Sequence, residues 1–230
     1  MTAPPAAPGG FDFHAAQKTG RSPFMAAIGF VDRQLNRRAA ALLVRAVYRT
    51  RVTPNQLTWV SALFGCAAAA LFARGDTSAF VLAGAAAQLS SIIDGADGML
   101  ARAKGMSSVF GSHLDLFLDR VIDFSIFAGI AVGASRHFQA PHLLALGLLA
   151  TGLYQLQIIL FYLTKNYLKS EERGDTGEAR AVLYWLVFLF AVTSRLDLFI
   201  YLLLAETLVL NTFRIGYFVS LGRRSGAQRR

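Results

Sequence analysis

Five aspartates lie within long apolar stretches of the chain, where a charged side chain is unexpected. Asp94 and Asp97 fall in one stretch, and Asp115, Asp119 and Asp123 fall in the next. A carboxylate at the centre of a membrane costs roughly 2.5–3.5 kcal/mol, and intramembrane acids usually mark a functional site. These five aspartates are therefore the first candidates for chemistry.

Helical periodicity gathers the acids on two faces. The residues that share the first face, an arc of roughly 140° at about 100° per residue, are Asp94, Asp97, Gly98, Ala101 and Arg102. The residues that share a face of the next helix, each four positions after the last, are Gly111, Asp115, Asp119 and Asp123. Because the loop between the two helices is short, we expect them to be antiparallel neighbours whose acidic faces meet.

Carboxylates that gather in this way repel one another unless a cation neutralises them. No matching cluster of buried Lys or His accompanies them. All-oxygen ligation suits Mg²⁺, Mn²⁺ or Ca²⁺ rather than zinc or copper. The small residues Gly98, Ala101 and Gly111 are explained either by close helix packing or by space for a flat base and a diphosphate. The pattern predicts a divalent-metal site suited to a nucleotide diphosphate.

The composition places these helices in a membrane protein. Of the 230 residues, 54% are hydrophobic and only 16% are charged, and the mean hydropathy is +0.44. The apolar residues come in blocks of roughly 20, the length that a helix needs to cross a bilayer. The net charge of +9 lies mostly between these blocks, where it serves orientation and contact with lipid headgroups. Membrane lipids are therefore expected partners and nucleic acid is not.

The pattern along the chain predicts an all-α protein, a six-transmembrane-helix bundle preceded by a cytoplasmic amphipathic interfacial helix. Residues 1–22 are expected to form a disordered N-terminal tail. Over residues 23–50 apolar residues alternate with arginines, as in a helix that lies in the membrane interface. The bundle is expected over 51–222 and a basic C-terminal tail over 223–230. The six expected spans are about 55–73, 78–102, 109–133, 141–166, 180–195 and 197–220.

The basic residues also predict the orientation. With the N-terminus inside, most of the 23 Lys and Arg fall on the inner side. An odd number of spans would place one basic terminus outside. We therefore expect a multi-pass protein of the cell (inner) membrane whose acidic site faces the cytoplasm.

The spacing of the acids and small residues resembles a known family signature. The constellation is Asp94-x2-Asp97-Gly98-x2-Ala101-Arg102-x8-Gly111-x3-Asp115-x3-Asp119. It matches every fixed position of the signature of the CDP-alcohol phosphotransferase (CDP-alcohol phosphatidyltransferase) family. The stretch from Thr53 to Thr58 is also similar to this family, and the run from Gln88 to Gly95 looks like the inositol-phosphate-type branch that includes di-inositol phosphate phosphate synthases.

The resemblance implies a role for each residue of the signature. Asp94, Asp97 and Asp115 would hold two divalent ions, Mg²⁺ or Mn²⁺, and Asp119 would complete the metal site and act as general base. Asp123 either pairs with Arg120 or supports the site. The residues implied to contact the CDP group are Gly98, Ala101, Arg102, Gly111, Asn55 and Thr58. Arg102 is explained nearly as well by a role as cytoplasmic anchor, and Asn55 and Thr58 are explained about as well by helix capping.

The implied reaction transfers a phospho-alcohol such as phosphatidyl from a CDP-linked donor to an acceptor hydroxyl and releases CMP. The donor would be CDP-diacylglycerol or a CDP-polyol. Lys165, Arg180 and Arg214 resemble the basic trio that binds an acceptor phosphate, such as that of inositol phosphate or glycerol phosphate, in family members. Lys165 and Arg180 are explained as well by anchoring at the inner surface. The resemblance also implies a homodimer.

Two other functions fit parts of the pattern. A CDP-choline or CDP-ethanolamine type transferase acting on a diacylglycerol would need no phosphate pocket for its acceptor. An ion or proton transporter would also gather carboxylates in the membrane. Transporters often show paired repeats and broken helices near the midplane, whereas these acids lie toward one side and no internal repeat is found.

Overall fold

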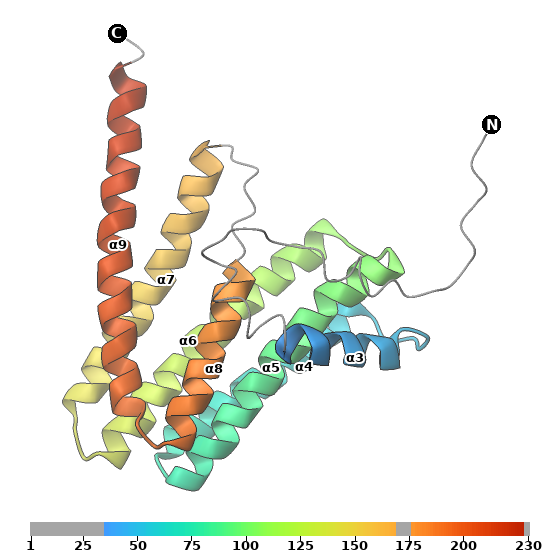
Figure 1. Ribbon diagram of the computed structural model, residues 1–230, viewed down its shortest axis with the longest axis horizontal. Helices are drawn as coiled ribbons and strands as arrows, with labels where there is room; N and C mark the ends of the chain where they lie inside the picture. The colour runs from blue at the N-terminus through green and yellow to red at the C-terminus, as the bar shows by residue number, and fades with distance from the viewer. Residues whose placement is uncertain (1–34, 169–175, 228–230) are drawn as a thin grey trace.

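In the computed structural model, residues 35–168 and 176–227 are described, and within them all the regular structure is helical (Figure 1). This confirms the expected all-α class. The helices are α3 (Arg37–Val47), α4 (Pro54–Arg74), α5 (Thr77–Lys104), α6 (Val109–His137), α7 (His142–Leu168), α8 (Thr176–Val192) and α9 (Leu196–Ala227).

Capping residues fix the ends of the helices that carry the acids. Thr53 and Gln56 form a capping box at the start of α4, with the Thr53 side chain and the Gln56 side chain each bonded to the other's backbone N–H. α5 ends at Gly105, whose φ of 65° suits a residue without a Cβ. Ser108 caps α6 by accepting a hydrogen bond from the Gly111 N–H at 3.0 Å. Only residues 105–108 separate α5 from α6, so the chain reverses direction between them, and both helices pack chiefly against α4 rather than against each other.

Two glycines let α6 approach α4 very closely. A Cβ added at Gly129 would run into the backbone carbonyl of Ala69, and one added at Gly133 would run into that of Phe72. Small residues at helix interfaces permit such backbone contact in membrane bundles. The contact holds the acid-bearing helix α6 against α4.

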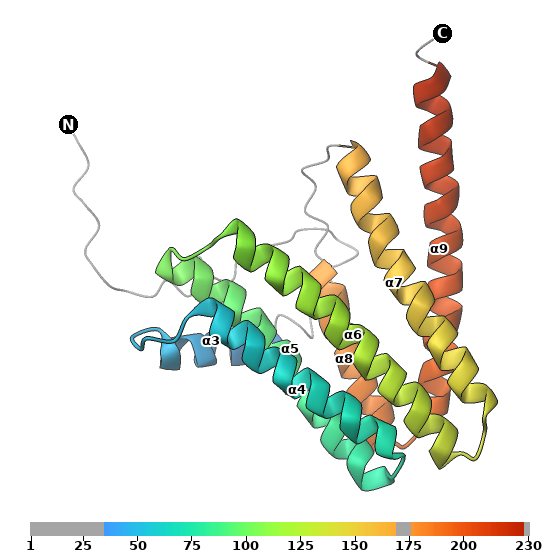
Figure 2. The same ribbon diagram turned by 180° about the vertical axis from the view of Figure 1, so that it is seen from behind.

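The helices surround two clusters of buried apolar side chains. The larger cluster includes Ile122, Phe127 and Phe199, whose exposed fractions are 1%, 2% and 1%. A smaller cluster, with Val44 and Leu100 at its centre, lies where α3 meets α4 and α5. Figures 1 and 2 show α7 and α9 side by side, with α3 lying across the pair formed by α4 and α5.

A buried asparagine fixes the start of α3. The Asn36 Oδ1 accepts hydrogen bonds from Gln88 of α5 at 2.6 Å and from Trp185 of α8 at 3.1 Å. Within the range expected for the amphipathic interfacial helix, the structure has a helix over Arg37–Val47, while residues 23–34 lie outside the described residues. Its position in a membrane interface stays a prediction.

Four described helices are long and apolar enough to cross a membrane. These segments are Pro54–Arg74, Thr77–Lys104, His142–Thr164 and Leu196–Ser220. α6 is equally long but carries Asp115, Asp119, Arg120 and Asp123, and α8 has only 17 residues. α9 continues to Ala227, so its last turns extend into the segment that was expected to be a basic tail.

Candidate active site

Three of the aspartates converge where α5 and α6 face each other. Asp94 and Asp97 come from α5 and Asp115 comes from α6, and one oxygen of each lies within 4.8 Å of the others. Asp97 is buried, and the other two are half-buried. The short loop between the helices makes this meeting possible, because it places the last turns of α5 opposite the first turns of α6.

The surroundings of these three carboxylates suit a cation. Thr58 of α4 donates a hydrogen bond of 2.6 Å to Asp97 Oδ2 and thereby orients that carboxylate. Asp115 Oδ1 is buried and has no hydrogen-bond partner among the described residues. A buried acceptor oxygen without a hydrogen-bond donor costs free energy unless a ligand binds to it. The all-oxygen donor set therefore fits a divalent ion such as Mg²⁺ or Mn²⁺.

Asp119 is not one of the three converging acids, but it lies beside them and contacts an arginine of α8. Arg180 donates from Nη1 to Asp94 Oδ2 at 2.9 Å and to Asp119 Oδ1, and from Nε to Asp123 Oδ1 at 2.9 Å. Only 7% of Arg180 is exposed. One buried guanidinium thus joins three of the five carboxylates and offsets part of their mutual repulsion.

Asp123 holds this arginine in place. It is fully buried, and its Oδ1 also accepts a hydrogen bond of 2.8 Å from the Tyr184 hydroxyl. Its Oδ2 lies 3.0 Å from the Arg120 Nη2. Asp123 therefore connects α6 to α8 and has both arginines as ionic partners.

The small residues border the acid cluster on its open side. A Cβ at Gly98 would lie 3.4 Å from the Arg102 Nη1, and one at Gly111 would lie 3.3 Å from the Asn55 Oδ1. Ala101 lies one turn beyond Gly98, half-buried. The first turn of α4 thus reaches Gly111 through Asn55 and Asp97 through Thr58.

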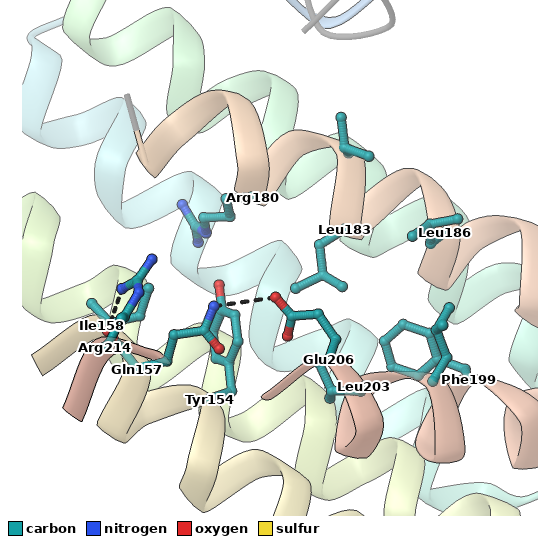
Figure 3. Close-up of a pocket in the computed structure, with 12 residues that line it drawn as sticks. Tyr154, Gln157, Ile158, Arg180, Leu183, Leu186, Phe199, Leu203, Glu206 and Arg214 are labelled. Carbon is teal, nitrogen blue, oxygen red and sulfur yellow. Dashed lines mark hydrogen bonds between the residues drawn. The ribbon is translucent and has the colours of Figure 1, made fainter. Parts of the chain in front are cut away.

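A cavity of about 350 Å³ opens between α7, α8 and α9, next to the acids. Arg180 and Arg214 line one end, and Leu186 and Phe199 line the other (Figure 3). Arg180 therefore borders both the acid cluster and the cavity. The Lys165 backbone belongs to α7, but its side chain lies outside the described residues.

Two further polar residues of the cavity were not singled out from the sequence. Gln157 of α7 donates from Nε2 to Glu206 Oε1 of α9 at 3.2 Å. Arg214 donates from Nη1 to the Gln157 carbonyl at 2.7 Å. The sequence held one usable signal, because Glu206 is an isolated acid within an apolar segment.

Comparison with known proteins identifies related chains. A family model described as CDP-alcohol phosphatidyltransferase matches residues 51–213. Over 103 residues the chain is 43% identical to a bifunctional IPC transferase and DIPP synthase of Thermococcus kodakarensis, covering 45% of this chain and 23% of that protein. Over 96 residues it is 38% identical to an archaetidylinositol phosphate synthase of Pyrococcus horikoshii, covering 42% of this chain and 50% of that protein. The chain thus matches half or less of the length of these curated relatives.

A solved structure shares the fold. The crystal structure of Mycobacterium tuberculosis phosphatidylinositol phosphate synthase with CDP-DAG bound aligns with a TM-score of 0.62 at 21% identity. The alignment covers 78% of this chain and 92% of that one.

Proposed function

Because this chain belongs to the CDP-alcohol phosphatidyltransferase family, we propose that it transfers a phospho-alcohol group from a CDP-linked donor to a hydroxyl of a phosphorylated polyol. The observation that carries this proposal is the convergence of Asp94, Asp97 and Asp115 beside a cavity that contains two arginines. The carboxylates suit a metal-bound diphosphate, and the arginines suit a phosphorylated acceptor.

The three converging aspartates, with Asp119 beside them, would hold Mg²⁺ or Mn²⁺. Such ions neutralise negative charge on the donor diphosphate and on the departing CMP. Thr58 keeps one oxygen of Asp97 occupied, which directs the other oxygen of that carboxylate. The orphaned Asp115 Oδ1 offers a further ligand atom.

Asp119 is the proposed general base. It is not one of the three converging carboxylates, and a carboxylate that two metal ions hold tightly is a poor base. In the reaction it removes the proton of the acceptor hydroxyl as that oxygen forms a bond to the phosphorus. The bond between phosphorus and the oxygen of CMP breaks, and CMP leaves with the electron pair.

The residues proposed for the nucleotide half of the donor surround the open side of the acid cluster. Gly98, Ala101 and Gly111 leave room for the cytidine, and Asn55 beside Gly111 can hydrogen-bond to it. Thr58 acts through Asp97, and Arg102, which is exposed, is placed to meet the diphosphate.

The acceptor phosphate is proposed to bind at the basic end of the cavity. Arg180 and Arg214 line that end, and Lys165 ends the same helix that contributes Gln157. Arg180 also contacts Asp119, so an acceptor held here would have a hydroxyl close to the proposed base. The names of the matched relatives, which include inositol phosphate products, favour a phosphorylated inositol as acceptor.

The proposed setting is the cell membrane, with six spans formed by α4 to α9. The ion pairs that Asp119 and Asp123 form with Arg180 would compensate charges that α6 carries within the membrane. The acid cluster would face the cytoplasm, α3 would lie in the inner interface, and the chain would act as a homodimer.

The proposal is tested with purified protein, Mg²⁺ or Mn²⁺, a panel of CDP-linked donors and a panel of acceptors. The measured quantity is CMP release. We expect release with CDP-diacylglycerol or a CDP-polyol only when a phosphorylated polyol is also present. No CMP from any pairing would refute the proposal, and release with diacylglycerol as the acceptor would favour the CDP-choline type of reaction instead.

A further inference from the structure

The polar half of the cavity contains more than its two arginines. Gln157 lines the cavity with only 6% of its surface exposed. Its Nε2 donates to Glu206, but its Oε1 is buried and finds no hydrogen-bond partner among the described residues. Buried amide oxygens are normally paired, so an unpaired one on a residue that lines a cavity points to a ligand that donates a hydrogen bond.

Glu206 adds a second acceptor at the same place. Its carboxylate lies in the segment Leu196–Ser220, which is apolar enough to span a membrane and is therefore an expensive position for an acid. A carboxylate has two oxygens with about four acceptor sites, and Gln157 occupies one of them. The Gln157 Oε1 and the Glu206 carboxylate thus form a hydrogen-bond-accepting site, which we name the Gln157–Glu206 pair.

This pair lies beyond the cationic end of the cavity. Glu206 and Arg214 are eight residues apart on α9, which corresponds to about 12 Å along the axis. Helical side chains lean toward the N-terminus, so Arg214 leans toward Glu206. The two groups do not touch directly but are joined by Gln157, whose backbone carbonyl accepts from Arg214 and whose amide donates to Glu206 (Figure 3).

The arrangement has the polarity of a polyol phosphate. Guanidinium groups at one end suit a phosphate. The Gln157–Glu206 pair can accept hydrogen bonds from hydroxyl groups of a ligand whose phosphate lies at the arginine end of the same cavity. A cavity of about 350 Å³ is within the range of small-ligand sites. A phosphate with few hydroxyls would leave the Gln157 oxygen unpaired, which is costly in a buried site.

We propose that Gln157 and Glu206 determine acceptor specificity by accepting hydrogen bonds from the ring hydroxyls of a cyclic polyol phosphate, and so favour inositol phosphate over glycerol phosphate. This inference rests on the proposed function, since it concerns the acceptor of the same reaction. Neither residue contacts the acid cluster in the structure, so their effect should fall on the acceptor and not on the donor.

The test compares kcat/KM for inositol phosphate and glycerol phosphate with CDP-diacylglycerol as donor. Gln157→Met and Glu206→Met remove the accepting oxygens while keeping side-chain length, and Glu206→Gln keeps one oxygen. The matched control is Asn211→Leu, which breaks another bond between α9 and α7, from Asn211 Nδ2 to the Leu153 carbonyl at 2.9 Å, outside the cavity lining. The ratio of the two kcat/KM values is independent of the fraction of active protein.

We expect Glu206→Met to raise the KM for inositol phosphate about tenfold or more, the factor that one hydrogen bond to a charged group supplies, and Gln157→Met to raise it about threefold to tenfold, because its hydrogen bond is between neutral groups. The preference for inositol phosphate over glycerol phosphate should fall by a similar factor in each variant, and the KM for the donor should stay within about twofold of the wild-type value. Glu206→Gln should reduce the preference less than Glu206→Met does. Asn211→Leu should keep the wild-type preference.

Three results would overturn the inference. If both Met variants keep the wild-type preference for inositol phosphate, the Gln157–Glu206 pair does not determine acceptor specificity. An equal loss in Asn211→Leu would assign the effect to packing between α7 and α9. A wild-type protein that prefers glycerol phosphate would refute the inference and leave the proposed transfer intact, whereas absence of CMP release with every acceptor would refute the proposed function itself.

Discussion

At the residue scale, Thr58 and Arg180 hold carboxylates of the acid cluster in different ways. Thr58 gives Asp97 a hydrogen bond that leaves its negative charge in place. Arg180 forms ion pairs with Asp94, Asp119 and Asp123, which reduce the net charge of the cluster. A metal ion benefits from the first kind of partner and competes with the second for shared oxygens.

We predict that Thr58→Val lowers the apparent affinity for Mg²⁺ or Mn²⁺ by about tenfold, since loss of a partner that orients a ligand typically costs 10–100-fold. kcat at saturating metal should change much less. The measurement is CMP release as a function of metal concentration after removal of bound ions with a chelator.

The control for this variant is Ser61→Ala. Ser61 donates to the Ser90 carbonyl at 3.0 Å and so joins the same two helices, away from the acids. An equal shift of the metal requirement in both variants would mean that helix packing, and not the orientation of Asp97, controls metal binding.

Sequence spacing alone identified which acids belong together, because residues three or four apart share a helix face. It also identified the family, which the match over residues 51–213 confirms. It could not show that Arg180 pairs with Asp94 and Asp119, since these residues lie 86 and 61 positions apart. The sequence did not single out Gln157, because the role of a glutamine in an apolar helix depends on the residues that surround it in the folded protein.

At the element scale, the approach of α6 to α4 positions the cluster, because Asp115 and Thr58 lie on these two helices. Glycine is required where the backbones touch. Gly133 faces the Phe72 carbonyl, and any Cβ there must push the helices apart.

We therefore predict that Gly133→Ala lowers the free energy of unfolding by about 1–3 kcal/mol, the usual cost of overpacking. Thermal unfolding in detergent measures this as a lower Tm. Gly152→Ala on α7 is the control, since a Cβ there meets nothing within 4 Å and alanine favours the helix. If Gly133→Ala unfolds at the same temperature as Gly152→Ala, the close contact does not stabilise the bundle.

The helices themselves were well anticipated from hydropathy. The second expected segment, about 78–102, corresponds to the helix Thr77–Lys104, and the third, 109–133, corresponds to the helix Val109–His137. The largest differences occur where helices continue beyond the apolar segment, as α9 does to Ala227. Hydropathy cannot detect such ends, because a helix that leaves the membrane needs no apolar side chains.

At the scale of the whole molecule, the charged residues of the candidate active site lie at one end of the bundle. The acids lie near the end of α5 and the start of α6, and Arg180 lies near the start of α8. In the proposed orientation, each of these helix ends would lie on the cytoplasmic side.

We predict opposite accessibility for two loop positions in a Cys66→Ala background, which removes the only cysteine. Ser107→Cys in the loop from α5 to α6 should react with a membrane-impermeant thiol reagent only from the cytoplasmic side. Thr193→Cys in the turn from α8 to α9 should react only from the outside. Both residues are exposed, so burial does not protect them. Labelling of both positions from the same side would contradict the six-span arrangement.

The central claim is that the carboxylates of α5 and α6 carry out the transfer, with Asp119 as the base. The most direct test is the rate of CMP release by Asp119→Asn and by the wild-type protein, with saturating metal, CDP-diacylglycerol and inositol phosphate. Asparagine keeps the size of the side chain but cannot take up the proton. We therefore predict that the rate falls by a factor of about 10² or more, while donor binding is retained. CMP release by Asp119→Asn at the wild-type rate would contradict the account.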